Sequence, residues 1–328
     1  MANIVTVKSQ QTSYKIKKRA TRIFISVFRW VFLLAISYIL LYPLLYMLSA
    51  AFRAPADFVD STVVWVSKTF TLENFKIAFQ ALDYANAFKN TFYIEIISAL
   101  IEVVTCAITA YGLSRFEFRE KKFLTFILIV TILVPTQMIM LPLRVSMNHL
   151  DILGIFNFLL VDLGGMSEDI LPGVLNTPFA FYIPSIFAVG LKAGLFIFMY
   201  VQFFKGMPKE LEEAAYIDGA GPLKTFIRIV VPSSGVIILT VSIFSVIWHW
   251  NDVYLSQMFI GNNSMYTLSS RLSKLYTTLD GMGYGKYARA TVGKAMAGCV
   301  LVIAPMLIMY CILQRNFIKS VDRIGIVG

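Results

Sequence analysis

The sequence predicts an all-α integral membrane protein with about six transmembrane helices. Of its 328 residues, 58% are apolar and only 15% are charged, and the mean hydropathy is +0.71. A soluble domain is about 45–50% apolar and about one-quarter charged, so the excess apolar surface is expected to face lipid. Several apolar runs also exceed the ~20 residues that a helix needs to cross a bilayer.

The apolar runs define the order of the elements. Six spans are expected, at 24–52, 90–114, 123–143, 181–204, 233–251 and 295–314. The first run is longer than the apolar core of a signal peptide, which has about 7–15 residues, so we expect an uncleaved helix. The remaining divisions are a basic N-terminal arm at 1–23, an external loop at 53–89, a core at 90–314 that includes an external insertion at 144–180, and a C-terminal tail at 315–328.

The Lys and Arg residues set the expected orientation. With the N-terminus in the cytoplasm, seventeen of them fall in the inside segments, which are 1–23, 115–122, 205–232 and 315–328. Ten fall in the longer outside segments, which are 53–89, 144–180 and 252–294. Positive residues collect on the cytoplasmic side of membranes, so both termini are expected there. The net charge of +10 would then lie beside anionic membrane lipid.

Composition and motifs argue against several other classes. Cys106, Cys299 and Cys311 lie inside apolar runs, and the two histidines are far apart, so no metal site is expected. No Gly-x4-Gly-Lys-Ser/Thr loop occurs, so the chain is not expected to bind a nucleotide itself. No nucleic-acid partner is expected either, because the membrane accounts for the basic charge.

The segment 205–232 predicts a helix–turn–helix between two spans, on the cytoplasmic side. Pro208 suits a first helical turn, because its missing N–H costs nothing there, and glutamates follow where the helix dipole favours negative charge. Gly219, Gly221 and Pro222 end this helix and begin a second one. Small side chains on the exposed face would let a partner approach closely. A membrane-surface loop without a partner is the alternative that these residues leave open.

The same segment resembles the EAA loop of the permease subunits of ATP-driven (ABC) importers. That motif reads Glu-Ala-Ala-x3-Gly-x9-Ile-x-Leu-Pro. With Val231 in place of the leucine, this chain matches it at Glu213, Ala214, Ala215, Gly219, Ile229 and Pro232. The resemblance implies the type I importer permease fold. It also implies that the loop seats in a cleft of a separate cytoplasmic ATPase, where Glu213 makes a polar contact, both alanines allow close approach and Gly219 forms the turn.

Four further segments are similar to the carbohydrate-uptake branch of this family, and to the shorter permease of the maltose system. They are 110–119, 203–211, 248–252 and 313–319. The resemblance implies a subunit of the bacterial inner membrane that is not an enzyme and binds no cofactor itself. Its implied partners are a second permease, in a heterodimer, two ATPase subunits that hold ATP and Mg, and an external solute-binding protein. The implied solute is a sugar or oligosaccharide, with a polyol, a uronate or a glycerol-phosphate as alternatives.

Two acidic residues within the second span are candidates for the solute path. Glu95 and Glu102 lie seven residues apart, so they share a helix face. Intramembrane carboxylates usually face a polar cavity or a charged partner. They could therefore line the path, or form a structural pair with a group such as Lys192.

Three further polar residues are weaker candidates for the path. Gln137 follows Pro135 in the third span and could bond either a solute or a neighbouring helix. Asn251 and Asp252 lie next to two tryptophans at the outer end of the fifth span. They fit a sugar site, or a polar helix end within an interfacial aromatic belt.

A self-sufficient, ion-coupled secondary transporter is the rival class. It would need an internal inverted repeat and groups that bind the coupling ion. The sequence has no clear repeat, and Glu95 and Glu102 are its only plausible coupling groups.

Overall fold

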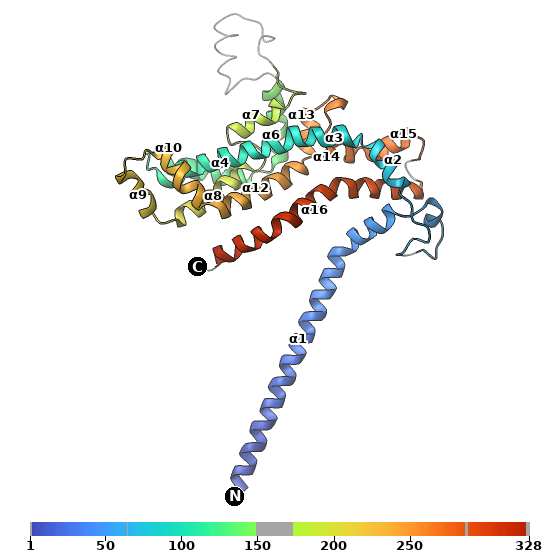
Figure 1. Cartoon of the computed structure of the whole chain (residues 1–328), viewed down its shortest axis with the longest axis vertical. Helices are drawn as coiled ribbons and strands as arrows, with labels where there is room; N and C mark the ends of the chain where they lie inside the picture. Colours follow the sequence, from blue (N-terminus) through green and yellow to red (C-terminus); the bar gives the residue numbers. More distant parts are fainter. Residues whose placement is uncertain (1, 64, 149–172, 286–287, 326–328) are drawn as a thin grey trace, which may run out of the picture.

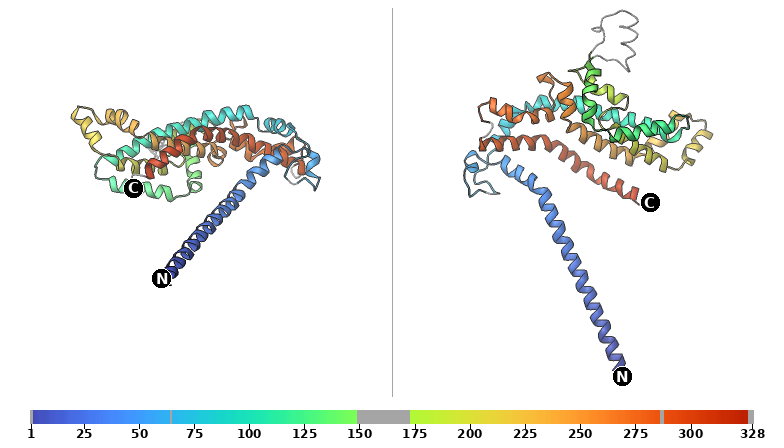
Figure 2. Two further views of the ribbon diagram at one scale, coloured as in Figure 1. Left: turned by 60° about the horizontal axis from the view of Figure 1, so that its bottom comes forward. Right: turned by 180° about the vertical axis from the view of Figure 1, so that it is seen from behind.

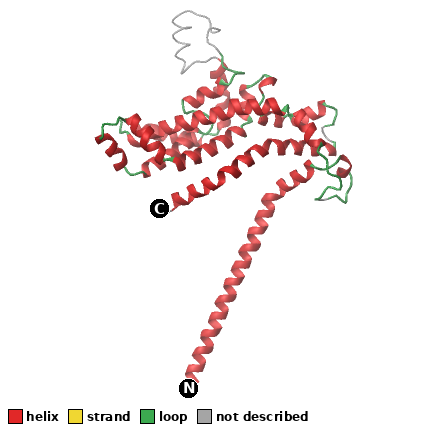
Figure 3. Cartoon of the chain, viewed as in Figure 1, coloured by secondary structure: helices red, strands yellow, loops and turns green. Residues whose placement is uncertain are grey.

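The computed structural model describes residues 2–63, 65–148, 173–285 and 288–325. This part of the chain is helical and contains no strand, which confirms the predicted all-α class (Figure 3). Much of the expected external insertion at 144–180 lies outside the described residues, as does the last part of the C-terminal tail.

The first helix, α1 (Ala2–Ala51), projects away from the other helices (Figures 1 and 2). The predicted span at 24–52 is the apolar part of this longer helix, because the basic arm continues in the same helical conformation. Within its apolar stretch Thr21–Ala51, a window of 18 residues has a mean hydropathy of 2.2, yet only 6% of that window is buried. From position 21 onward, where its side chains are described, the buried residues of α1 are Met47, Ala50 and Ala51 near its C-terminal end. The apolar stretch before them therefore offers its surface to lipid or to another subunit.

The centre of the bundle is one long helical unit, Tyr84–Arg115. It comprises α3 (Tyr84–Thr91), the π-helical stretch η2 (Phe92–Ile96) and α4 (Ile97–Arg115). Two other apolar helices, α8 (Ala193–Gly206) and α12 (Gly235–Trp250), share a core cluster with α4. Small residues of α4, such as Ala107 and Ala110, are almost fully buried there, which allows the helices to approach closely.

The last helix, α16 (Arg289–Gly325), runs beside α1 and the short helix α2 (Glu73–Ala81). It contains the predicted span 295–314 and continues beyond it at both ends. Short elements lie in the segments 53–89 and 252–294. They are η1 (Pro55–Phe58), α13 (Tyr254–Phe259), η6 (Asn263–Met265), α14 (Leu268–Ser273) and α15 (Leu275–Gly281).

Two predicted spans are wrong as single continuous helices. The span 123–143 is divided into α5 (Lys121–Leu133) and α6 (Thr136–Asn148), which are bent by 106°. The break falls at Pro135, which has no N–H to continue the helical bonds. The span 181–204 is divided into α7 (Phe179–Ile186) and α8, with Ala188 and Lys192 between them at positive φ. Hydropathy reports apolar length but does not report such breaks.

The fifth span begins after a second sharp bend. The segment Pro222–Ser233, which comprises α10 (Pro222–Thr225), η5 (Phe226–Val230) and α11 (Val231–Ser233), meets α12 at 81°. Within the described ranges, three single helices are long and apolar enough to cross a membrane, and each of the two bent pairs could supply one more span. The segment 205–232, called the coupling loop below, therefore leaves the bundle as a separate projection (Figure 1).

Candidate functional site: the coupling loop and an internal cavity

The coupling loop folds as a helix–turn–helix. Its first helix, α9 (Glu210–Ile217), ends at a turn in which Gly219 has φ +75°, and α10 follows. The Ala220 N–H donates to the Ala215 carbonyl at 2.9 Å, and the Gly219 N–H donates to the Tyr216 carbonyl at 3.1 Å. These two bonds form a Schellman cap, which requires a residue that tolerates left-handed backbone. A glycine at position 219 is thus explained by the local backbone.

The inner face of α9 is fixed by charge. Glu212 forms a 2.7 Å ion pair with Nε of Arg115, and the two side chains are only 6% and 7% exposed. The Tyr111 hydroxyl donates to the other Glu212 oxygen at 3.0 Å. The Tyr111 ring packs against Phe226 of η5, with centroids 4.8 Å apart. The end of α4 therefore contacts both helical arms of the coupling loop.

The outer face of the loop is open. Glu213 and Ala214 are exposed, and so is Pro232, while Ile229 is half-buried. Ala215 is only 7% exposed and faces the bundle. Of the two alanines expected at the ATPase contact, the structure exposes Ala214 and turns Ala215 toward the bundle, because successive helical residues are rotated by about 100° from each other.

Several large apolar side chains of the loop are exposed to solvent, three of them with more than half of their surface accessible. Ile217 is 86% exposed, Leu223 69% and Ile227 56%. They come from the end of α9, from α10 and from η5. Exposed apolar side chains gathered on one projection are typical of a surface that contacts another protein.

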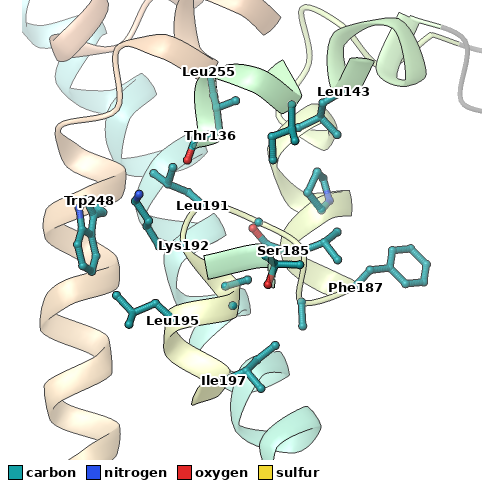
Figure 4. Close-up of a pocket in the computed structure, with 18 of the residues that line it drawn as sticks. Thr136, Leu143, Ser185, Phe187, Leu191, Lys192, Leu195, Ile197, Trp248 and Leu255 are labelled. Carbon is teal, nitrogen blue, oxygen red and sulfur yellow. The ribbon is translucent and has the colours of Figure 1, made fainter. Parts of the chain in front are cut away.

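A cavity of about 600 Å³ lies between α4, the α5–α6 bend, the α7–α8 break and α12 (Figure 4). Its lining is mostly apolar, and the polar residues in it are Glu95, Thr109, Thr131, Thr136, Ser185, Lys192, Trp248, His249 and Asp252. Figure 4 shows Lys192, Trp248 and Leu191 on one side of the cavity, with Ser185 and Phe187 across from them. Both helix breaks border this space, so the same interruptions that divide the spans also create the cavity.

Glu95 and Asp252 lie at the end of the cavity that is nearer α13. Glu95 is fully buried, one of its oxygens accepts a 2.7 Å bond from Ser256, and the other has no partner within the described structure. Asp252 accepts bonds from the N–H groups of Leu255 and Ser256 at 3.2 and 3.1 Å, which holds its carboxylate at the start of α13. Two buried acceptors thus face the same space.

Glu102 is also fully buried, but it lies behind the cavity wall. Its Oε2 atom is 3.5 Å from Nε2 of His249. A Cβ atom built on Gly190, in the α7–α8 break, would lie 2.7 Å from its Oε1. Among the described residues, the contacts found for Glu95 and Glu102 are with Ser256 and His249, and Lys192, the example given for a structural pair, is not one of them.

Two of the candidate path residues do not reach the cavity. Gln137 is exposed beside the α5–α6 bend, and its neighbour Thr136 lines the cavity instead. Asn251 is also exposed, and its amide donates to the Ile247 carbonyl at 2.8 Å. The orientations of these two side chains depend on the bend at Pro135 and on where α12 ends, so they could not be predicted from residue type alone.

Several polar lining residues are not among the path candidates of the sequence analysis, including Ser185, Lys192, Trp248 and His249. Trp248 packs on Phe196 and Phe244, both at 5.6 Å between centroids. The Trp248–Asp252 segment was noticed for its aromatic and polar content, which could have indicated His249. Lys192 lines the cavity because of the left-handed break before α8, and this break leaves no clear mark in the sequence.

The fold and the coupling loop define a class of membrane transport subunits. The family model of the binding-protein-dependent transport system inner membrane component matches residues 102–323. The chain belongs to this family and is a permease subunit of an ABC transporter rather than an enzyme. This assignment replaces the rival class of secondary transporters.

Curated relatives align over most of their length. The arabinooligosaccharides transport system permease protein of Halalkalibacterium halodurans is 26% identical, over 89% of this chain and 93% of its own. The melibiose/raffinose/stachyose import permease of Bacillus subtilis is 27% identical, over 87% and 91%. The trehalose transport system permease of Mycobacterium tuberculosis is 25% identical, over 90% and 95%.

A solved structure shares the fold. It is the crystal structure of a bacterial ABC transporter involved in the import of the acidic polysaccharide alginate. One of its chains superposes with a TM-score of 0.68 at 19% sequence identity, covering 91% of this chain and 98% of that one. The similarity confirms the importer permease fold.

Proposed function

We propose that this permease imports a sugar or an oligosaccharide. The observation that carries the proposal is that several curated relatives, aligned over most of both chains, are named for oligosaccharide uptake. The cavity supports it, because it combines the Trp248 ring with buried carboxylate acceptors, and sugars present apolar ring faces and hydroxyl donors. A polyol, a uronate and a glycerol-phosphate are the alternative solutes.

The proposed partners follow from the coupling loop. Glu213, Ala214 and the exposed Ile217 and Leu223 would seat in a cytoplasmic ATPase subunit, with Gly219 shaping the turn. The complex would contain a second permease, two ATPases that bind ATP and Mg, and an external solute-binding protein. Both termini would lie in the cytoplasm and the bundle in the inner membrane, as the distribution of Lys and Arg indicates.

Glu95 and Asp252 are the proposed path residues of this chain. They line the cavity, and one Glu95 oxygen is left free to accept a bond from a solute hydroxyl. Glu102 would support the cavity wall. A solute can shift the equilibrium between two conformations of the cavity only if it binds them with different affinities. Buried carboxylates that accept bonds from the solute in one conformation and not in the other would provide that difference in affinity.

The proposal is tested with the full chain, coexpressed with its partner permease and ATPase. Cells, or proteoliposomes with ATP inside and the solute-binding protein outside, are assayed for ATP-dependent uptake of labelled raffinose, arabinotriose and trehalose, and glycerol-3-phosphate serves as the comparison solute. We expect uptake of at least one saccharide and loss of the bound ATPase in Glu213→Lys. Glu120→Lys, an exposed acid outside the coupling loop, is the matched control. Uptake of glycerol-3-phosphate alone would contradict the sugar assignment.

A further inference from the structure

The coupling loop is attached to the bundle through a buried charged cluster. Glu212, on α9, and Arg115, the last residue of α4, are 2.7 Å apart and nearly excluded from solvent. Nη2 of Arg115 also donates to the Met207 carbonyl at 3.1 Å, just after α8. One guanidinium therefore joins the end of α8 to α9.

Tyr111 completes the cluster. Its hydroxyl donates to Glu212 at 3.0 Å and lies 3.4 Å from the Tyr216 hydroxyl. Its ring is packed between Phe226 of η5 and Phe204 of α8. Both Glu212 oxygens are thus engaged by residues of α4, one turn apart on the same face.

Adjacent glutamates of α9 face in opposite directions. Glu212 is buried and points into the bundle, whereas Glu213 is exposed. Ala215, three residues after Glu212, is buried on the same inner side. The helix therefore has one face for an external partner and another face tied to α4.

The buried cluster suits the transmission of force. Apolar side chains can slide past each other at a small cost, but a buried ion pair that is pulled apart leaves both charges without partners. The guanidinium of Arg115 is also held at a second point, because its Nη2 atom donates to the Met207 carbonyl, and two contacts constrain orientation as well as distance. Before Arg115, α4 packs on α7, α8 and α12, and its residue Thr109 lines the cavity.

We propose that the cluster of Arg115, Glu212 and Tyr111 is the clamp through which movement of α9 reaches α4 and the cavity. Glu212 and Arg115 are positioning residues, because they act on the cavity through α4. The inference rests on the proposed docking of an ATPase on the outer face of α9. It goes further by giving the two neighbouring glutamates different roles. Glu213 contacts the ATPase, and Glu212 connects α9 to α4.

The test measures whether ATP changes the cavity. Cys106, Cys299 and Cys311 are replaced by Ala, Thr109→Cys is introduced, and the complete complex is placed in nanodiscs. The rate of modification by a water-soluble maleimide is measured with and without ATP plus vanadate. With Glu212 present, we expect ATP plus vanadate to change this rate about tenfold. In Glu212→Gln the change should fall below about twofold, while the ATPase stays bound and still hydrolyses ATP.

Glu210→Gln is the matched control, because it removes an exposed acid from the first turn of the same helix. It should keep the full change. Tyr111→Phe provides a second test if Glu212→Gln does not assemble, since it removes one bond and keeps the packed ring; we expect an intermediate change. The clamp would be overturned if Glu212→Gln or Tyr111→Phe kept the full change in labelling rate. It would also be overturned if the labelling rate of the wild-type complex, with its ATPase bound, did not change with ATP plus vanadate. A wild-type chain that binds no ATPase would instead refute the proposed function.

Discussion

Glu102 and His249 face each other in the interior of the bundle, with Glu102 Oε2 3.5 Å from His249 Nε2. The side chains are 0% and 4% exposed, and Nδ1 of His249 lies 2.9 Å from the Ser245 carbonyl. The α7–α8 break passes directly over this pair, because Gly190 lies against the Glu102 carboxylate. The pair therefore links α4 and α12 beneath the cavity wall, and it depends on a glycine in the break.

The first prediction concerns Gly190. A Cβ at this position would lie 2.7 Å from Glu102 Oε1 and 3.0 Å from Ser185 Oγ, both on buried side chains. We expect Gly190→Ala to lower the free energy of unfolding by about 1–3 kcal/mol, the usual cost of overpacking. Thermal unfolding of the detergent-solubilised protein measures the change. Gly112→Ala on α4 is the control, because its Cβ would meet nothing within 4 Å; equal destabilisation by both would contradict the close approach.

The second prediction concerns the energetic coupling of Glu102 and His249. Groups in direct contact give non-additive effects, with an interaction energy of about 0.5–3 kcal/mol in a double-mutant cycle. We expect a value in this range for Glu102→Gln and His249→Gln, obtained from the midpoints of urea unfolding. The cycle of Glu102→Gln with Gln257→Ala, an exposed residue of α13, should be additive. Additivity in both cycles would mean that the two side chains do not interact.

The third prediction concerns the turn of the coupling loop. Gly219 has φ +75°, which costs a residue with a Cβ about 1–2 kcal/mol. We expect Gly219→Ala to weaken copurification of the ATPase while leaving membrane insertion intact, because the turn directs α10 away from α9. Quantitative immunoblotting of the purified complex checks this. Gly206→Ala, at the end of α8 where a Cβ would have open space, should copurify as much ATPase as the wild type.

The fourth prediction concerns pH and the segment after α1. Asp57 accepts bonds from the Ser67 hydroxyl at 2.6 Å and from the N–H groups of Lys68 and Thr69 at 2.9 and 3.1 Å. These bonds, the Ser67 bond above all, lower the pKa of the Asp57 carboxyl below its ordinary value. A lowered folded-state pKa stabilises the fold above the unfolded pKa, and this contribution is lost as the pH falls through the folded pKa.

We therefore expect Asp57→Asn to be less stable than the wild type at pH 7, with the difference shrinking below about pH 4. Limited proteolysis of residues 53–72 as a function of pH measures it. Glu73→Gln, an exposed acid close by on α2, should match the wild type over the same range. A difference for Asp57→Asn that does not depend on pH would show that the carboxylate charge is not what holds the segment.

The membrane class and the coupling loop were predictable because both leave local marks. Apolar length reports a span directly, and Gly219 with Pro222 marks a turn whatever surrounds it. The family match bears out the class. The same local reasoning was wrong for 123–143 and 181–204, where the chain breaks within an apolar stretch. A proline such as Pro135 can interrupt a helix, but the angle of 106° depends on how α5 and α6 pack.

The sequence by itself determined that this chain lies in a membrane, which segment projects from it and to which family it belongs, because composition and motif spacing are properties of neighbouring residues. Only the tertiary structure decided which polar groups meet. Glu212 contacts Arg115, which is 97 positions away in the sequence, and Glu102 contacts His249, which is 147 positions away. Such contacts depend on helix rotation and on breaks that bring distant segments together. Because these groups are buried, each of them needs its partner, since an unpaired buried charge is costly.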